Sequence, residues 1–112
     1  MKKINIKLKG NFDIFSSTTI EKVDGKKQKW TEILIHGDPK GLKSFAELIL
    51  QLANYDQDKD DKLPKGAREH IQLSPKHQLS KSSDTVILGR LDAKGTGEFY
   101  DRYQKKSKNN TH

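Results

Sequence analysis

Residues 37–55 read GDPKGLKSFAELILQLANY and carry the clearest structural signal in the chain. Apolar side chains recur there at the spacing of one helix face, at Leu42, Phe45, Ala46, Ile49, Leu52 and Ala53. Asp38 suits the N-cap position and Pro39 the first helical position. The pattern predicts one long amphipathic helix over Pro39–Tyr55, with Leu42, Phe45, Ile49 and Leu52 as its buried stripe.

The sequence before this helix has the character of β-strands. Residues 4–8 alternate apolar and polar side chains with a period of two, and residues 12–20 are rich in β-prone types. Residues 30–36, WTEILIH, form the next apolar run. Asp24-Gly25 lies between the last two segments and is a strong hairpin signal. We therefore expect three strands before the helix.

The sequence after the helix begins with a polar stretch, residues 56–66, that predicts an exposed loop. Short β-prone runs follow at 70–73 and 85–90. The expected order is β-β-β-α-β-β, which makes an α+β domain with a mostly antiparallel sheet and the helix on one face. This single domain is expected to cover residues 1–103, and residues 104–112 are expected to be a disordered basic tail.

The two faces of such a sheet have different compositions. The face toward the helix is expected to bury Ile4, Ile6, Leu8, Ile33, Ile35, Ile71, Leu73, Val86 and Leu88. The opposite face then carries Trp30, Leu34, His36 and His70, a mixture typical of a recognition patch. Two other interpretations stay open: the segment around Phe99 and Tyr100 covers this patch, or a second copy of the chain does.

Length and composition exclude several classes of protein. The 112 residues are enough for one core. The chain contains no cysteine, so disulfides and thiolate chemistry are excluded. No run approaches 18 apolar residues, and the basic start lacks the continuous apolar region of a secretory signal. These features favour a cytoplasmic protein without a membrane partner.

The net charge of +7 is unevenly distributed. Eight lysines outweigh three acidic residues in 1–30, seven acidic residues outweigh three lysines in 31–61, and eleven cations outweigh five acidic residues in 62–112. The acidic concentration at 56–61 is suited to steering a basic partner. The basic ends also permit a second hypothesis, a small nucleic-acid-binding module, although no RNA-binding aromatic motif is visible.

No complete catalytic or metal-binding motif is present. Asp56, Asp58 and Asp60 have the spacing that opens a calcium loop, but Asp61 and Ala67 occupy the positions that need Gly and Glu. His36 and His70 lack a third zinc ligand at a recognisable spacing. Nucleophile and phosphate-loop motifs are also missing. The sequence therefore predicts a protein that is not an enzyme and has no metal or cofactor.

Several short segments, taken in order, carry a family resemblance. They are Gly37-Asp38-Pro39-Lys40-Gly41-Leu42, Phe45-Ala46-Glu47-Leu48, His70-Ile71-Gln72-Leu73-Ser74-Pro75 and Val86-Ile87-Leu88-Gly89-Arg90. Together they resemble family 32 of the bacterial polymorphic-toxin immunity proteins, over roughly Ile33–Leu91. The family pattern often has a second histidine where this chain has Gln72. The resemblance implies a small cytoplasmic α+β protein that binds and neutralises a cognate toxin, and it supplies no catalytic residues.

The combined expectation is a non-catalytic immunity protein, with the nucleic-acid-binding module as the alternative. Its partner would be the cognate toxin protein, and a homodimer is also compatible with the sequence. The residues expected to contact the partner are Trp30, Leu34, His36, His70, Asp56, Asp58, Asp60 and Asp61. The basic tail is not expected to take part, because it lacks an apolar anchor and would lose entropy on ordering.

Overall fold

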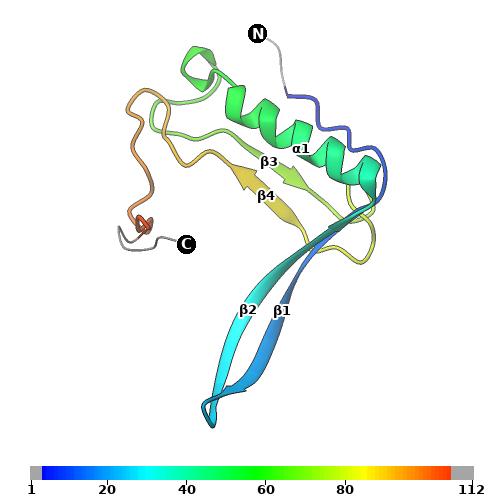
Figure 1. Cartoon of the computed structure of the whole chain (residues 1–112). Helices are drawn as coiled ribbons and strands as arrows, with labels where there is room; N and C mark the ends of the chain where they lie inside the picture. The colour runs from blue at the N-terminus through cyan, green and yellow to red at the C-terminus, as the bar shows by residue number, and fades with distance from the viewer. Residues whose placement is uncertain (1–3, 107–112) are drawn as a thin grey trace.

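The structure is a computed structural model that describes residues 4–106. Within that range, the elements are β1 (Phe12–Val23), β2 (Lys26–Gly37), α1 (Pro39–Asn54), the 3-10 helix η1 (Gln57–Lys59), β3 (His70–Leu73) and β4 (Val86–Gly89). β1 pairs antiparallel with β2 and β3 with β4, so the strands form two separate two-stranded sheets (Figure 1). The α+β class is confirmed. The order is β-β-α-β-β, with one strand fewer than expected before the helix.

The predicted strand over residues 4–8 is wrong, because the extended backbone there pairs with helix side chains and not with another strand. Ser44 Oγ accepts from the Lys9 N–H at 3.2 Å and donates to the Lys9 carbonyl oxygen at 2.8 Å. Two turns further along α1, Gln51 accepts from the Asn5 N–H at 2.8 Å and donates to the Asn5 carbonyl at 3.3 Å. The side chains of α1 thus satisfy backbone groups that a neighbouring strand would otherwise pair.

The period-two pattern of this segment still has a physical cause. Ile4 and Leu8 are partly buried against the core, whereas Ile6 between them is exposed. An extended chain places all three side chains on one side, as a strand does, and here only the first and the last of them contact the core. The pattern therefore identified the backbone conformation correctly and the pairing partner wrongly.

The β1–β2 hairpin projects from the rest of the molecule (Figure 1). Its two-residue turn has positive φ at both Asp24 (53°) and Gly25 (79°), as the Asp-Gly hairpin signal predicts. Each strand has twelve residues, which corresponds to a length of about 40 Å. The radius of gyration is 17.4 Å, whereas a compact chain of this size has about 13 Å. The hairpin accounts for the elongated shape.

The core lies between α1, β3 and the base of the hairpin. Its buried residues are Phe12, Ile14, Phe45, Leu48, Leu52, Ile71, Leu73 and Leu79. The expected burial of Ile71 and Leu73 is confirmed, and Val86 and Leu88 are partly buried as packing neighbours. The expected burial of Ile33 and Ile35 is wrong, since their exposed fractions are 64% and 50%. The hairpin contacts the core through Phe12 and Ile14 of β1, whereas Ile35, opposite Ile14, and Ile33, one pair farther out on the same face, remain exposed on β2.

Helix α1 begins as predicted and presents a slightly rotated face. The Asp38 carboxylate accepts from the Gly41 N–H at 2.7 Å, which caps the helix. Phe45 and Leu52 are buried as expected, and Phe45 lies 4.4 Å from the Phe12 ring between centroids. Leu42 and Ile49 are exposed, contrary to expectation, and the fully buried residue of the helix is Leu48. The stripe of apolar residues is wider than the face that the core covers.

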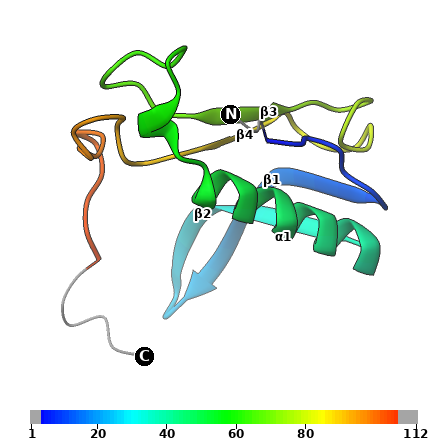
Figure 2. The same cartoon turned by 90° about the horizontal axis from the view of Figure 1, so that it is seen from above.

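Residues 80–84 connect the two sheets. The Ser80 and Asp84 N–H groups donate to the Phe12 and Ile14 carbonyl oxygens at 3.1 and 2.8 Å, so this segment runs beside the base of β1. The buried Ser83 hydroxyl accepts from the Ile14 N–H at 2.9 Å. Seen from above, α1 runs along one side of the body and β3–β4 along the other (Figure 2).

Candidate partner-binding surface

The register of the hairpin determines which side chains share a face. Phe15 lies opposite Leu34, Thr19 opposite Trp30, and Asp13 opposite His36. Directly opposite residues of an antiparallel pair project on the same side of the sheet. Phe15, Trp30, Leu34 and His36 therefore share one face, which we call the Trp30 face. The grouping of Trp30, Leu34 and His36 made from the sequence is reproduced, and Phe15 joins it from β1.

Polar side chains hold the base of the Trp30 face in place. His36 Nδ1 lies 3.8 Å from Asp13 Oδ1, and the imidazole meets the Phe15 ring edge-on with centroids 5.6 Å apart. The other Asp13 oxygen accepts from the Ser82 hydroxyl at 2.6 Å. His36 is thus oriented by contacts from β1 while most of its side chain remains in solvent. Such an arrangement presents an aromatic surface in one conformation.

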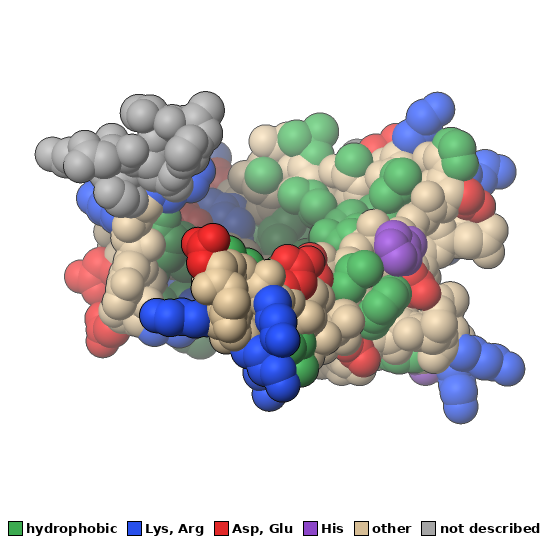
Figure 3. All heavy atoms as spheres, turned by 60° about the horizontal axis from the view of Figure 1, so that its bottom comes forward, with side chains coloured by type: hydrophobic (Ala, Val, Ile, Leu, Met, Phe, Trp, Pro, Cys, Tyr) green, Lys and Arg blue, Asp and Glu red, His purple; other side chains and the backbone are tan. Residues whose placement is uncertain are grey.

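The opposite face of the hairpin is also apolar: Phe12 and Ile14 are buried in the core at its base, and other apolar side chains on it are exposed. Ile33, Ile35 and Ile20 lie on it, and all three are exposed. Sequence reasoning assigned the first two to the core, so this part of the surface was missed. Figure 3 looks onto the side from which the hairpin projects: hydrophobic side chains gather in the upper and right-hand parts of the view, and lysines cluster toward the viewer. The lysines near the turn are Lys22, Lys26, Lys27 and Lys29.

The C-terminal aromatic residues have partners other than the Trp30 face. The Arg68 guanidinium lies 3.9 Å from the centroid of the Tyr100 ring, and Arg102 lies 5.2 Å from the same ring. Phe99 packs edge-on against Tyr103 at 5.3 Å. Trp30 remains 37% exposed. One interpretation of the sequence was that the C-terminal segment covers the patch around Trp30. The ring contacts of this segment are instead with Arg68, Arg102 and one another.

His70 lies in a different part of the molecule from His36. It stands opposite Gly89 in the β3–β4 pair, whereas His36 is in the other sheet. A groove of about 400 Å³ lies beside it, lined by Arg68, His70, Ile87, Tyr100 and Arg102 among others. Arg68 supplies the nearer cation on the Tyr100 ring, a contact that sequence reasoning missed. The structure therefore separates the two histidines that the sequence placed together.

The aspartate-rich stretch 56–61 lies at the other end of the body from the hairpin turn (Figures 1 and 2), and two of its aspartates accept hydrogen bonds. Asp58 accepts from the Gly95 N–H at 2.8 Å. Asp60 accepts from the Tyr55 hydroxyl at 2.6 Å, and this hydrogen bond raises the pKa of Tyr55 to about 12. The stretch contains η1, whose Gln57 is buried, so the loop is more ordered than the sequence suggested.

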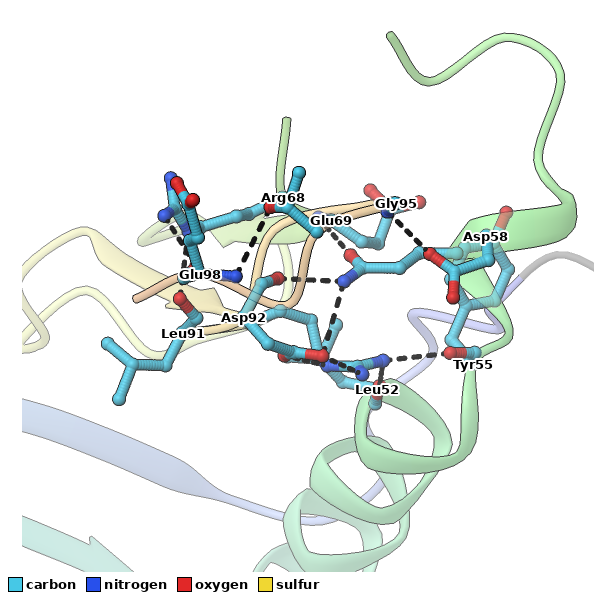
Figure 4. Close-up of polar contacts among 12 residues, drawn as sticks. Leu52, Tyr55, Asp58, Arg68, Glu69, Leu91, Asp92, Gly95 and Glu98 are labelled. Atoms are coloured by element: carbon cyan, nitrogen blue, oxygen red, sulfur yellow. Dashed lines mark hydrogen bonds and ion pairs between the residues drawn. The ribbon is translucent and has the colours of Figure 1, made fainter. Parts of the chain in front are cut away.

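Arg90, which follows β4, donates hydrogen bonds to the C-terminal end of α1, where Figure 4 labels Leu52 and Tyr55. Arg90 Nη1 donates to the Tyr55 and Leu52 carbonyl oxygens at 2.8 and 3.3 Å, which satisfies groups that a helix leaves free at its end. Its Nη2 lies 2.7 Å from Asp92 Oδ2, and this hydrogen bond holds the pKa of Asp92 below its usual range. Gln57 Nε2 donates to the Asp92 carbonyl at 2.7 Å. The network fastens the chain after β4 to the end of α1.

Among residues 4–106, no three His, Cys, Asp or Glu side chains come together as a metal-binding group. No helix in that part of the chain has the length and apolar character needed to cross a membrane.

Comparison with known families adds one result. The family model described as "Immunity protein 32" matches residues 32–91, which is more than half of the chain. The chain belongs to the immunity protein 32 family. Proteins of this family are non-catalytic, so this immunity protein is not an enzyme. No curated protein and no solved structure matches it.

The residues that the family model matches are mostly not those of the projecting hairpin. Asp38, Gly41 and Arg90 lie inside 32–91 and have structural roles. A Cβ at Gly41 would approach the Asn11 carbonyl oxygen to 2.1 Å, so the close contact requires glycine. β1 and the first six residues of β2 precede the match. The family model thus covers the framework of this immunity protein, and most of the hairpin lies outside it.

Proposed function

We propose that this immunity protein binds a cognate bacterial toxin through the Trp30 face and neutralises it by occupying its surface. The observation that carries the proposal is the projecting hairpin: Trp30 is exposed on it, with Phe15 and Leu34 half-buried on the same face, in a protein whose family acts without catalysis. Exposed apolar surface of this kind usually marks an interaction site. We place the encounter in the cytoplasm, where a toxin that has entered the cell finds its target.

The chemistry of the Trp30 face suits protein recognition. Trp30 supplies a large flat surface with an N–H donor, and aromatic residues contribute most to the free energy of such interfaces. Phe15 and Leu34 lie beside it in a strand pair held by twelve cross-strand pairs. Little conformational entropy is lost when a preformed surface binds. We therefore assign the central contact to Trp30, with Leu34 and His36 toward the base.

In this proposal, the aspartates of residues 56–61 act through long-range electrostatic attraction and not through direct contact. The acidic stretch lies at the end of the body that is far from the hairpin turn, and it contains Asp56, Asp58, Asp60 and Asp61. His70 also lies away from the Trp30 face. The contribution of the aspartates is a negative field that orients a basic partner on approach, which affects the association rate more than the dissociation rate. His70 belongs to the groove beside Arg68 and is a secondary contact in this scheme.

One observation favours the alternative function. The Arg68–Tyr100–Arg102 stack combines cations and an exposed aromatic ring, the elements that bind single-stranded nucleic acid. The two functions differ in salt dependence. Phosphate contacts release counterions and weaken binding steeply as salt rises, whereas an apolar protein interface changes little. An oligonucleotide titration at two salt concentrations therefore tests the alternative directly.

The experiment for the proposed function first asks whether a neighbouring gene encodes a toxin, and then uses the toxic domain of that protein. Co-expression of the two should restore growth, and purified protein should bind the domain. Trp30→Ala should weaken that binding by about 2 kcal/mol or more, since Trp30 is the anchor. Leu50→Ala is the matched control, because it truncates an exposed aliphatic side chain on α1, away from the hairpin. Equal binding by the parent and Trp30→Ala, with a loss for Leu50→Ala, would place the site elsewhere.

A further inference from the structure

Along residues 27–35, the backbone groups at the outer edge of β2 have no strand partner among residues 4–106. Ile14 of β1 directs its N–H away from β2, to Ser83 Oγ. Ile14 is paired with Ile35, and opposite residues of an antiparallel ladder point their backbone groups both inward or both outward. The odd-numbered residues of β2 therefore point outward. Within residues 4–106, no other segment forms backbone hydrogen bonds with them.

The matching edge of β1 is partly covered. Residues 80–84 donate to the Phe12 and Ile14 carbonyl oxygens, and Asp84 Oδ2 accepts from the Ser16 N–H at 3.1 Å. The open part of the β1 edge thus begins beyond Ser16. In the described part of the chain, no segment pairs with the outer edge of β2. The exposed side chains of Ile33 and Ile35 make this edge more apolar than the edge of β1. Long apolar edges of this kind pair readily with another strand.

The charge distribution along β2 indicates which strand fits. Three lysines, Lys26, Lys27 and Lys29, lie in the half nearest the turn. The other half, residues 30–37, has Glu32 as its one acidic group and no lysine. Two β2 strands running antiparallel place the lysine half of each against the lysine-free half of the other. The antiparallel direction therefore keeps the lysines of the two strands apart, whereas in the parallel direction they would lie side by side and repel one another.

We propose that two copies of this chain pair through their β2 edges, antiparallel about a two-fold axis that passes close to Thr31 or Ile33. The pairing produces one four-stranded sheet, β1-β2-β2-β1, from two hairpins. An axis at Glu32 is disfavoured because it sets two carboxylates directly opposite each other. The apolar stretches of the two strands then lie side by side, and outward N–H and C=O groups find partners.

The dimer leaves the faces of the sheet open. Strand-edge pairing uses backbone groups in the plane of the sheet, whereas Trp30, Leu34 and Phe15 project above that plane. The two Trp30 faces become parts of one wider surface. The proposal goes beyond toxin binding and does not depend on it: a monomeric chain that binds toxin would refute the dimer alone.

Two proline variants provide the main test. Thr31 and Thr18 lie opposite each other, and both point their N–H groups outward, to the β2 and β1 edges respectively. Proline at either position removes an outward donor and leaves the β1–β2 ladder intact. Light scattering of the parent protein should give twice its 12.8 kDa mass. Thr31→Pro should give the single-chain mass, and Thr18→Pro should stay dimeric. Circular dichroism checks that both variants fold.

Cysteine cross-linking tests the geometry independently, since the chain has no cysteine of its own. Hydrogen-bonded antiparallel pairs have Cα atoms about 5.5 Å apart, within the range that a disulfide spans. Under mild oxidation, Thr31→Cys or Ile33→Cys should form a covalent dimer, and Thr18→Cys should not. A parent protein that is monomeric at every concentration tested, or cross-linking that is equally fast for Thr18→Cys, would overturn the proposal.

Discussion

Substitutions at two neighbouring residues can test which face helix α1 turns toward the core. Leu48 is 1% exposed and Ile49 is 44% exposed, whereas sequence periodicity alone assigns Ile49 to the core. Either residue changed to alanine loses about three carbon atoms, worth about 2.4 kcal/mol of transfer free energy when fully buried. Leu48→Ala also leaves an enclosed cavity, which brings its expected cost to about 3–5 kcal/mol. Ile49→Ala loses about half of the transfer term, or about 1 kcal/mol.

Urea denaturation of the two variants measures these free energies of unfolding. The slope of the transition should be the same for both, since neither changes the surface exposed on unfolding to a large extent. Leu50→Ala serves as a control in the same helix, because its side chain is exposed and its loss should cost about 0.5 kcal/mol or less. Ile49→Ala costing as much as Leu48→Ala would show that the helix presents the face given by the sequence pattern, and would refute the packing described above.

Three further predictions concern polar contacts. Arg90→Ala should reduce the free energy of unfolding by about 1.5–3 kcal/mol, measured by denaturation, because it exposes the helix C-terminus; an unchanged value would show that water replaces the guanidinium. The lowered pKa values of Asp38 and Asp92 stabilise the folded state at pH values above the unfolded pKa of about 3.9, and this stabilisation is lost as pH falls through the folded pKa. Asp92→Asn should therefore make the free energy of unfolding depend less on pH on the acid side. A pH profile identical to the parent's would contradict this. Asp60→Asn should lower the pKa of Tyr55 from about 12 toward 10, followed by ultraviolet titration; a phenol that still titrates near 12 would assign the shift to another cause.

The candidate surface was only partly predictable, and the reason is geometric. Strand alternation places Trp30, Leu34 and His36 on one face without reference to tertiary structure. Whether His70 and the aspartates join this face depends on which elements are neighbours in space. His70 does not lie on it, because the two sheets are separate. The Arg90 contacts with the end of α1 join residues more than thirty positions apart. No local pattern encodes such a contact.

The sequence by itself determined the local structure. Asp38 and Pro39 set the start of α1, Asp24-Gly25 set the turn, and the family motif lies within the framework, because caps, turns and side-chain periods depend on neighbouring residues alone. The tertiary structure decided which apolar side chains are buried. Ile33 and Ile35 carry the same strand signal as Ile71 and Leu73, yet only the latter pair is covered, because the hairpin contacts the core through Phe12 and Ile14 of β1 and leaves these β2 side chains exposed.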